Sequence, residues 1–393
     1  MAPQLPWPPR FAPLPDTDPD AGLAALRRLG REVWATARIV AASILDLPDF
    51  EVKLALGEAL FTLTEVAAAI EERLAELGSA PDRTLPEPLA DRLAADLALP
   101  PADRPPALLH RWCGPLADRF AAAGFDPLLD GPTERVRRRA LADLRDAFGW
   151  LTDTYGDTPA PPPAAGSALR VGRPAMGARD ARFRLFEHTR DYRRADDWTS
   201  SGSAYDDDRV ELLRINRDEI DALETFALAL FDLVEEAPLE VLRHLARLAW
   251  DEARHAAIGH ALLAEDGTDP YRYACSMIGI RVRGAMAGWD AWTQITLFGE
   301  LGIIGPMRAL EREARRRGDT RTATAFHYVC RDETMHLKDS RHLLDRHHPA
   351  GGLAAAGEAA RKRAGALLAE LGLLSEEQYA ALDERQIFAL LGE

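Results

Sequence analysis

The chain has few aromatic and few β-branched residues, and this scarcity limits the folds it can adopt. Aromatic residues make up 7% of its 393 residues, whereas alanine, leucine, arginine and glutamate are abundant. β-Sheets favour β-branched and aromatic side chains, and the abundant residues here are strong helix formers. We find no β-hairpin signal and no alternating strand of useful length. The composition therefore predicts an all-α fold, and 47% hydrophobic residues suffice for a sizeable core.

Long apolar runs and a secretory signal are also missing. No uncharged run approaches the roughly 18 to 20 residues that cross a bilayer. The N-terminus, MAPQLPWPPRFAPLPDTDPD, is proline-rich and lacks the apolar segment of a signal peptide. The three cysteines, Cys113, Cys275 and Cys330, are odd in number and widely spaced, which favours reduced, buried thiols over disulfides or a thiolate metal site. These features predict a cytoplasmic protein that does not enter a membrane.

The chain has fewer basic than acidic residues. The chain holds 48 lysines and arginines against 63 acidic residues, a formal net charge of −15. Such a chain repels phosphate backbones, so we expect no nucleic-acid partner. The basic clusters ERVRRRALADLR and EREARRRGD are interleaved with acids at helical spacing, which is typical of solvated helix faces.

Proline and glycine divide the chain into predicted segments. These are a proline-rich tail (1–20), an N-terminal helical domain (21–155), a Pro/Gly/Ala-rich linker (156–185), a second helical domain (186–348) and short C-terminal helices (349–393). Apolar residues at helical spacing predict long helices in both domains. The predicted helices span residues 23–45, 50–77, 132–156, 216–236, 238–266, 288–318 and 319–347.

A Glu-x-x-His motif occurs twice in the second domain. Glu252 and His255 lie in AWDEARHAAIGH, and Glu333 and His336 lie in RDETMHL. Residues three apart project to the same side of a helix, so each pair can bind one metal ion together. A single copy is common on solvated helices. Both copies here follow apolar stretches, and a buried carboxylate costs several kcal/mol unless a cation or partner compensates it.

Two further acids lie about one helix length before the motifs. Glu300 is the only charged residue between Asp290 and Arg308. Glu224 is embedded in the apolar stretch DALETFALALF. Glu219 is the main alternative to Glu224; it lies about 140° round the same helix, so only one of the two can face a site. The apolar neighbours favour Glu224.

One glutamate from each of two helices and a Glu-x-x-His from each of two others is the pattern of a carboxylate-bridged two-metal bundle. The predicted ligands are Glu224, Glu252, His255, Glu300, Glu333 and His336. Carboxylates and imidazoles without thiolates favour iron or manganese over structural zinc. Asp251 and Asp332 lie four residues before the two histidines, so each can accept the Nδ1–H of the histidine on its own helix. An ion-paired core without metal is the alternative.

In these segments the chain resembles the ferritin-like superfamily of carboxylate-bridged di-metal proteins, and within it a bacterial group of ferritin-like domain proteins. The likeness is carried by residues 216–263 and 318–340 and covers at least residues 205–345. It implies a ferritin-like four-helix bundle and the same six ligands. The N-terminal half also resembles that group, but its middle reads FTLTEV (residues 61–66) without histidine. We therefore predict a degenerate bundle that binds no metal.

The resemblance implies oxygen chemistry. Reduced di-iron sites of this kind give O₂ one electron from each ion, and the superfamily uses this for hydroxylation, N-oxidation, desaturation, radical generation or ferroxidation. The leading hypothesis is a di-iron or Mn/Fe oxidoreductase that oxidises a small organic substrate, with O₂ as co-substrate. An external electron donor and a homodimer are the other expected partners. Helical spacing predicts a substrate pocket lined by Ala227, Leu228, Phe231, Thr296, Ile303 and Met307.

Two other functions stay open from the sequence. One is a ferroxidase-type metal-binding protein without an organic substrate. The other is an interaction scaffold with a vestigial site, but the presence of all six ligands argues against it.

Gly299, Gly302 and Gly305 flank Glu300. Each costs a helix about 1 kcal/mol relative to alanine. They provide either room for a distorted turn beside the metals or close packing between helices.

Overall fold

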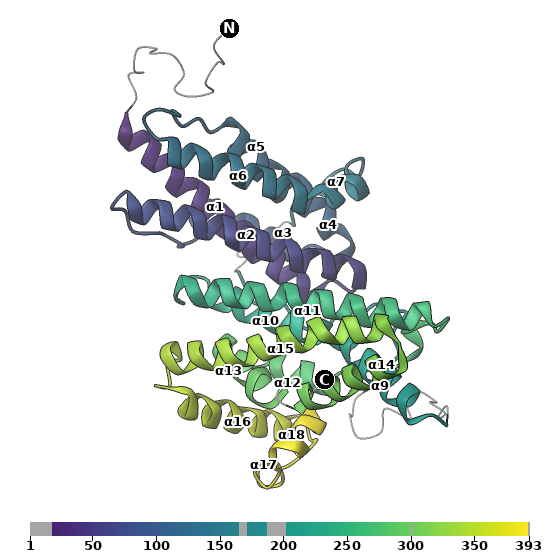
Figure 1. Cartoon of the computed structure of the whole chain (residues 1–393). Coiled ribbons are helices and arrows are strands. Elements are labelled where there is room, and N and C mark those ends of the chain that lie inside the picture. Colours follow the sequence, from purple (N-terminus) through teal and green to yellow (C-terminus); the bar gives the residue numbers. More distant parts are fainter. Residues whose placement is uncertain (1–17, 165–170, 187–201, 300–301, 392–393) are drawn as a thin grey trace. The chain divides into compact units, whose positions relative to one another are not determined.

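The structure is a computed structural model, and it describes residues 18–164, 171–186, 202–299 and 302–391 (Figure 1). Helices account for nearly all of its regular structure, which confirms the predicted all-α class. The strands in the described ranges are β1 (Leu185–Phe186) and β2 (Cys275–Ser276), which form one short parallel pair. No helix in these ranges is both long and apolar enough to cross a membrane.

The chain divides into two compact units. Unit 1 comprises residues 1–39 and 62–171, and unit 2 comprises residues 40–61 and 172–393. Helices α1 (Pro19–Asp46) and α2 (Phe50–Glu76) therefore each contribute to both units. This division differs from the expected boundary near residue 155, because residues 40–61 group with the C-terminal part of the chain. Helical periodicity marks a helix but does not show which neighbours cover each of its ends.

Unit 1 consists of short helices that follow parts of α1 and α2. They are α3 (Glu87–Leu97), η1 (Pro101–Asp103), α4 (Arg104–Ala107), the π-helix η2 (Leu108–Cys113), α5 (Gly114–Ala122), α6 (Gly131–Ala147) and α7 (Gly149–Tyr155). The predicted helix 132–156 is thus two helices, which meet at Phe148 and Gly149. In the core of this unit, Trp34 donates its indole N–H to Glu71 at 2.7 Å.

Unit 2 holds the longer C-terminal helices, and α11 is in contact with α9, α10 and α15. Its helices are α9 (Ala204–Asp218), α10 (Ile220–Leu233), α11 (Leu239–Glu265), η4 (Pro270–Arg272), α12 (Ile278–Gly284), α13 (Gly288–Gln294), the π-helix η5 (Ile295–Gly299), α14 (Ile304–Arg317), α15 (Thr320–His347), α16 (Leu353–Glu370), α17 (Glu376–Ala380) and α18 (Glu384–Leu391). Figure 1 shows α11 and α15 side by side, and α14 packs on both α15 and α9.

Helices α9 and α10 are separated by an interruption of the helical hydrogen-bond pattern at Glu219. The amide of Glu219 bonds to the carbonyl of Asn216 at 3.1 Å, an i to i−3 bond, and Glu219 has ψ of −2°. Such a tighter turn interrupts the regular helix and changes the direction in which its side chain projects. The predicted helix 216–236 therefore begins earlier, at Ala204, and is broken at this glutamate.

The predicted helix 288–318 is divided into α13, η5 and α14. The π-helical segment ends at Gly299, immediately before Glu300. Single π-turns cost helix stability and occur frequently at functional sites. Within the described residues, the five residues before Glu300 thus form a π-helical segment rather than regular α-helix.

Candidate metal site

Two long helices each place a glutamate and a histidine in the interior of unit 2. Glu252 and His255 lie on the buried face of α11, and Glu333 and His336 lie on the buried face of α15. Residues at i, i+3 and i+4 share a helix face, so the apolar residues of these helices carry the polar pairs into the core. Each of the four side chains is at most 2% exposed.

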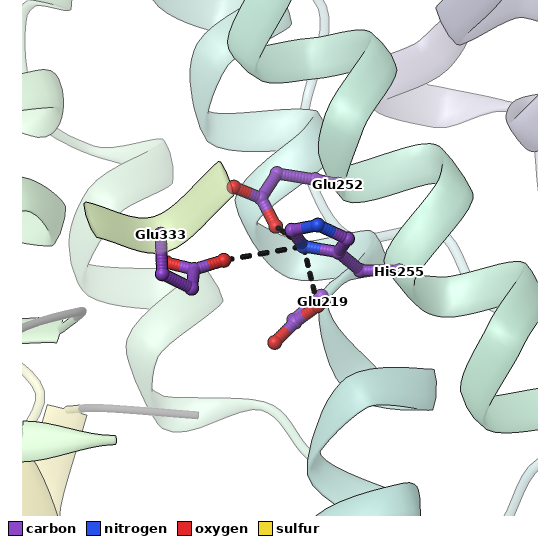
Figure 2. Close-up of side chains that lie close together, drawn as sticks. All are labelled: Glu219, Glu252, His255 and Glu333. Carbon is purple, nitrogen blue, oxygen red and sulfur yellow. Dashed lines mark hydrogen bonds and ion pairs between the residues drawn. The ribbon is translucent and has the colours of Figure 1, made fainter. Parts of the chain in front are cut away.

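Four side chains converge on one point (Figure 2). The Nδ1 atom of His255 lies 3.1 Å from a carboxylate oxygen of each of Glu219, Glu252 and Glu333. One ligand atom from each of the four residues lies within 4.8 Å of the others, and all four residues are buried. Three carboxylates and an imidazole at this spacing could hold a metal ion.

His336 extends this cluster. Its Nδ1 atom lies 3.1 Å from Oε1 of Glu252 and 3.8 Å from Oε1 of Glu333. Because Oε2 of Glu252 faces His255, the carboxylate of Glu252 stands between the two imidazoles. The two rings have their centroids 5.9 Å apart. We refer to Glu219, Glu252, His255, Glu333 and His336 as the carboxylate–histidine cluster.

The cluster contains buried polar atoms that lack a hydrogen bond. Oε1 of Glu252 and Nδ1 of His336 are inaccessible to solvent and lie 3.1 Å apart as an ion pair, but neither has a partner in hydrogen-bond geometry within the described residues. An unsatisfied buried polar atom costs about 1 to 3 kcal/mol. A cation between them would satisfy both, so the residues present fit a bound metal.

Glu219, rather than Glu224, belongs to the cluster. The break between α9 and α10 directs Oε2 of Glu219 toward His255, and Asn216 donates its side-chain N–H to the same oxygen at 3.1 Å. Glu224 is instead ion-paired with Lys53 and Arg179, and the side chains of all three are at most 1% exposed. The apolar neighbours that favoured Glu224 in the sequence thus surround a buried ion pair. In the sequence, Lys53 lies 171 positions and Arg179 lies 45 positions from Glu224.

The remaining predicted residues lie in several places. Glu300 is outside the described residues, so only its neighbour Gly299 can be placed. The predicted pocket residues on α10 (Ala227, Leu228 and Phe231) are buried core residues. Thr296 is buried in η5, and its hydroxyl has no hydrogen-bond partner in the described part of the chain. Ile303 and Met307 belong to an apolar cluster shared by α9, α11, α14 and α15.

The two aspartates bind the histidines crosswise. His336 approaches Asp251 through Nε2 at 3.2 Å, and His255 approaches Asp332 through Nε2 at 3.4 Å. The same-helix pairing through Nδ1 that the i, i+4 spacing predicted is therefore wrong. Each Nδ1 faces the carboxylates, which turns each Nε2 toward the neighbouring helix. A partner on Nε2–H still fixes the tautomer that leaves Nδ1 free to bind a cation.

Arg254 joins the two aspartates. Its guanidinium donates to Asp251 at 3.2 Å and to Asp332 at 2.7 Å, and Arg247 donates to Asp251 at 2.7 Å. The sequence reasoning missed both arginines. The i, i+3 and i, i+4 spacing of Arg254 and Arg247 from Asp251 was the signal that could have identified them.

We expect Asp332→Asn to weaken metal binding mainly on the His255 side, and Asp251→Asn mainly on the His336 side. Outer hydrogen-bond partners of ligand histidines typically contribute 10- to 100-fold, so a loss of about that size is expected for one of two ions. Stepwise Mn²⁺ titration of each variant, read by electron paramagnetic resonance, measures it. Equal weakening of both steps by each variant would contradict the crosswise arrangement.

Burial and mutual charge shift the pKa values of the cluster. Burial raises the pKa of Glu219 to about 8. Burial also acts to raise the pKa of Glu252, but His255 and His336 outweigh it and hold that pKa at about 2. For His255, burial lowers the pKa, but the surrounding glutamates outweigh it and raise the pKa well above its usual value. The pKa of His336 is raised in the same way by its contacts with Asp251 and Glu252. In the metal-free protein, protonated imidazoles therefore neutralise the carboxylates.

Metal binding is expected to release protons and to tighten as the pH rises. Metal ligands must be deprotonated, and the raised pKa values of Glu219, His255 and His336 mean that these groups still carry protons near neutral pH. Each proton displaced makes the apparent affinity change by about tenfold per pH unit below the pKa of that group. Mn²⁺ titrations by calorimetry in buffers of different ionisation enthalpy count the protons. An affinity independent of pH between about pH 6 and about pH 8 would contradict this expectation.

The cluster lies entirely in unit 2. In the described ranges of unit 1, no comparable group of acids, histidines and cysteines is found. The three cysteines are buried, free thiols.

Comparison of the chain with protein-family models, with curated proteins and with solved structures gives no match. The chemistry of the cluster is therefore the basis for assigning a function.

Proposed function

We propose that the protein is a ferritin-like, carboxylate-bridged di-metal oxidoreductase that activates O₂ to oxidise a small organic substrate. One observation carries this proposal. Glu252 stands between two buried imidazoles from two helices, with 3.1 Å from each of its oxygens to an Nδ1 atom, and Glu219 and Glu333 close the same space. A carboxylate between two histidines could bridge a pair of ions, as in carboxylate-bridged di-metal bundles.

The donor set favours iron or manganese. Glu219, Glu252, Glu333 and His255 would hold one ion, and His336 with the second oxygen of Glu252 would contribute to holding the other. Glu300, which follows the π-helical segment, is the proposed further ligand of that second ion. Oxygen and imidazole donors without thiolate suit redox-active first-row metals better than structural zinc. When bound, two ferrous ions would supply two electrons to O₂.

The chain's own residues set the conditions for this chemistry. An apolar cluster from α9, α11, α14 and α15, including Ile215, Phe326 and Val329, excludes water from one side of the ligands. Asp251 and Asp332 hold the imidazoles in the tautomer that directs Nδ1 inward. Arg254, half-buried between these two aspartates, compensates their charge. A dry, electrostatically fixed site of this kind limits side reactions of a reactive intermediate.

The proposal extends to parts of the protein that bear no ligand. We propose that unit 1 is the degenerate, metal-free bundle and that an external donor supplies electrons. Support for the first comes from Glu71, a buried acid of that unit, which accepts hydrogen bonds from Trp34 and Arg83 and is thus held in an ion pair. A homodimer remains an expectation from the sequence.

Metal loading followed by oxygen exposure tests the proposal. We expect the full chain to bind about two equivalents of Fe(II) under anaerobic conditions and then to consume O₂ in a single turnover. A double variant, Glu252→Ala with His255→Ala, should do neither. The matched control, Glu240→Ala with His347→Ala, removes an exposed Glu–His contact on the same two helices and should behave as the unaltered protein.

The outcomes separate the alternatives. Substrate-dependent O₂ consumption with an external reductant supports an oxygenase. Oxidation of excess Fe(II) without turnover of any organic compound would identify a ferroxidase instead. Retention of far fewer than two equivalents of iron or manganese would refute the di-metal site and leave a helical scaffold.

A further inference from the structure

A cleft of 590 Å³ opens between α9 and α14. Its apolar lining includes Leu212 and Ile215 from α9, Leu310 from α14 and Ile303 immediately before α14, each at most 6% exposed. This volume lies within the range of pockets that bind small organic molecules. Ile303 was among the pocket residues predicted from the sequence.

The apolar residues of the cleft continue into a core cluster shared with the helix that carries Glu333 and His336. Ile215 lies in the last turn of α9, four residues before Glu219 in the sequence. Ile215 and Ile303 also belong to the apolar cluster that contains Val329 and Cys330 of α15, which lie one turn before Glu333. The apolar cluster that lines the cleft thus reaches the helix turn that precedes Glu333.

The mouth of the cleft carries negative charge. The guanidinium of Arg317 is fixed 4.6 Å above the ring of Tyr205 and is neutralised by Glu313 at 2.7 Å. Asp208 lines the cleft, is exposed, and makes no hydrogen bond or ion pair within the described residues. Glu211 lies one turn further along the same wall. A cation at the mouth would therefore find an acidic partner there, whereas a carboxylate would be repelled.

We infer that the cleft binds an amphiphile with an unbranched apolar body and a protonated amine head, the head at Asp208 and the tail against Ile215 and Ile303. This inference rests on the proposed function in one respect: the tail end is the part presented to the metal site. From Tyr205 to Ile215 the wall is ten residues of helix, about 15 Å long. That length suits a linear chain better than a compact ring.

Alkyl chains with different head groups test the inference. We expect decylamine to bind the metal-loaded full chain more tightly than decanol, and decanol more tightly than decanoate, by calorimetry below the micelle concentration. Asp208→Asn should weaken decylamine binding by about two- to fivefold, the range of an exposed ion pair, and leave decanol unchanged. Asp206→Asn is the matched control, because Asp206 is an equally exposed acid of the same helix turn that does not line the cleft.

A second measurement asks whether the cleft leads to the cluster. Decylamine should change the electron paramagnetic resonance spectrum of bound Mn²⁺, and Ile303→Trp, which fills the cleft, should reduce decylamine binding by about tenfold or more without loss of Mn²⁺. Ile215→Trp provides the same test from the other wall if the first variant folds poorly.

The failures of the two proposals are distinguishable. If Mn²⁺ binds but decylamine does not, or if decanoate binds more tightly, the assignment of the cleft is overturned while the metal site stands. If decylamine binds with the expected dependence on Asp208 while no metal is retained, the cleft assignment stands and the proposed function fails.

Discussion

Glu219→Gln is expected to abolish tight metal binding while leaving the free energy of unfolding nearly unchanged, and Glu224→Gln is expected to do the reverse. Glutamine matches glutamate in size but is a neutral, weaker ligand. Burial raises the pKa of Glu219 to about 8, so its carboxyl is largely protonated at neutral pH in the metal-free protein. Replacement by an amide therefore changes little charge there, and Asn216 retains an acceptor.

Glu224 has a different role, because it compensates two buried cations. Lys53 and Arg179 both donate to its Oε1, and their side chains are 0% and 1% exposed. Burial lowers the pKa of Lys53 to about 8 even with Glu224 beside it. Removing one partner from a buried ion pair leaves uncompensated charge and typically costs about 3 to 5 kcal/mol.

Urea-induced unfolding and Mn²⁺ titration, each performed on both variants, check this pair. Unfolding should be followed by fluorescence and circular dichroism together, since a two-unit chain need not unfold in one step. Loss of metal in Glu224→Gln with retention in Glu219→Gln would reverse the assignment and restore the expectation from the sequence.

Glu252→Ala is expected to remove both metal ions, whereas His255→Ala and His336→Ala should each remove mainly one. Each oxygen of Glu252 faces a different histidine at 3.1 Å, so its carboxylate is shared between the two halves of the cluster. The loss of affinity should exceed the 10- to 100-fold that removal of an outer hydrogen-bond partner causes.

Metal analysis after gel filtration measures this effect, with thermal unfolding in the presence and absence of Mn²⁺ as a second readout. A bound ligand stabilises the native state in proportion to its affinity, so the metal-dependent rise in Tm should vanish in Glu252→Ala. Glu265→Ala is a suitable control, because it removes an exposed glutamate from the last turn of α11. Retention of one full equivalent by Glu252→Ala would show that Glu252 serves one ion only.

Local patterns in the sequence predicted much of this protein. The repeated Glu-x-x-His motifs identified Glu252, His255, Glu333 and His336 as candidates, and the structure brings these four together. Helix positions at α2, α11 and α15 agree with prediction to within about two residues. Both successes rest on interactions between residues at most four apart, which sequence spacing reports directly.

The sequence failed where a partner came from elsewhere in the chain. Glu219 and Glu224 are both buried, and the apolar neighbours that favoured Glu224 as the metal ligand do not distinguish a ligand from an ion-pair partner. The decisive neighbours of Glu224 are Lys53 on α2 and Arg179 in the segment before β1, which no local pattern connects to it. The break at Glu219, which directs that side chain toward His255, was likewise not signalled by proline or glycine.

Composition and periodicity by themselves determined the all-α class and placed an acid and a histidine on one face of each of two helices, because helix propensity and side-chain spacing are local properties. Tertiary structure alone decided which glutamate joins them, which helix supplies the aspartate for each imidazole, and which cations surround Glu224. Those outcomes depend on contacts between helices that are distant in the chain. A buried charged side chain is stable only beside a compensating partner, and tertiary packing determines which residue supplies it.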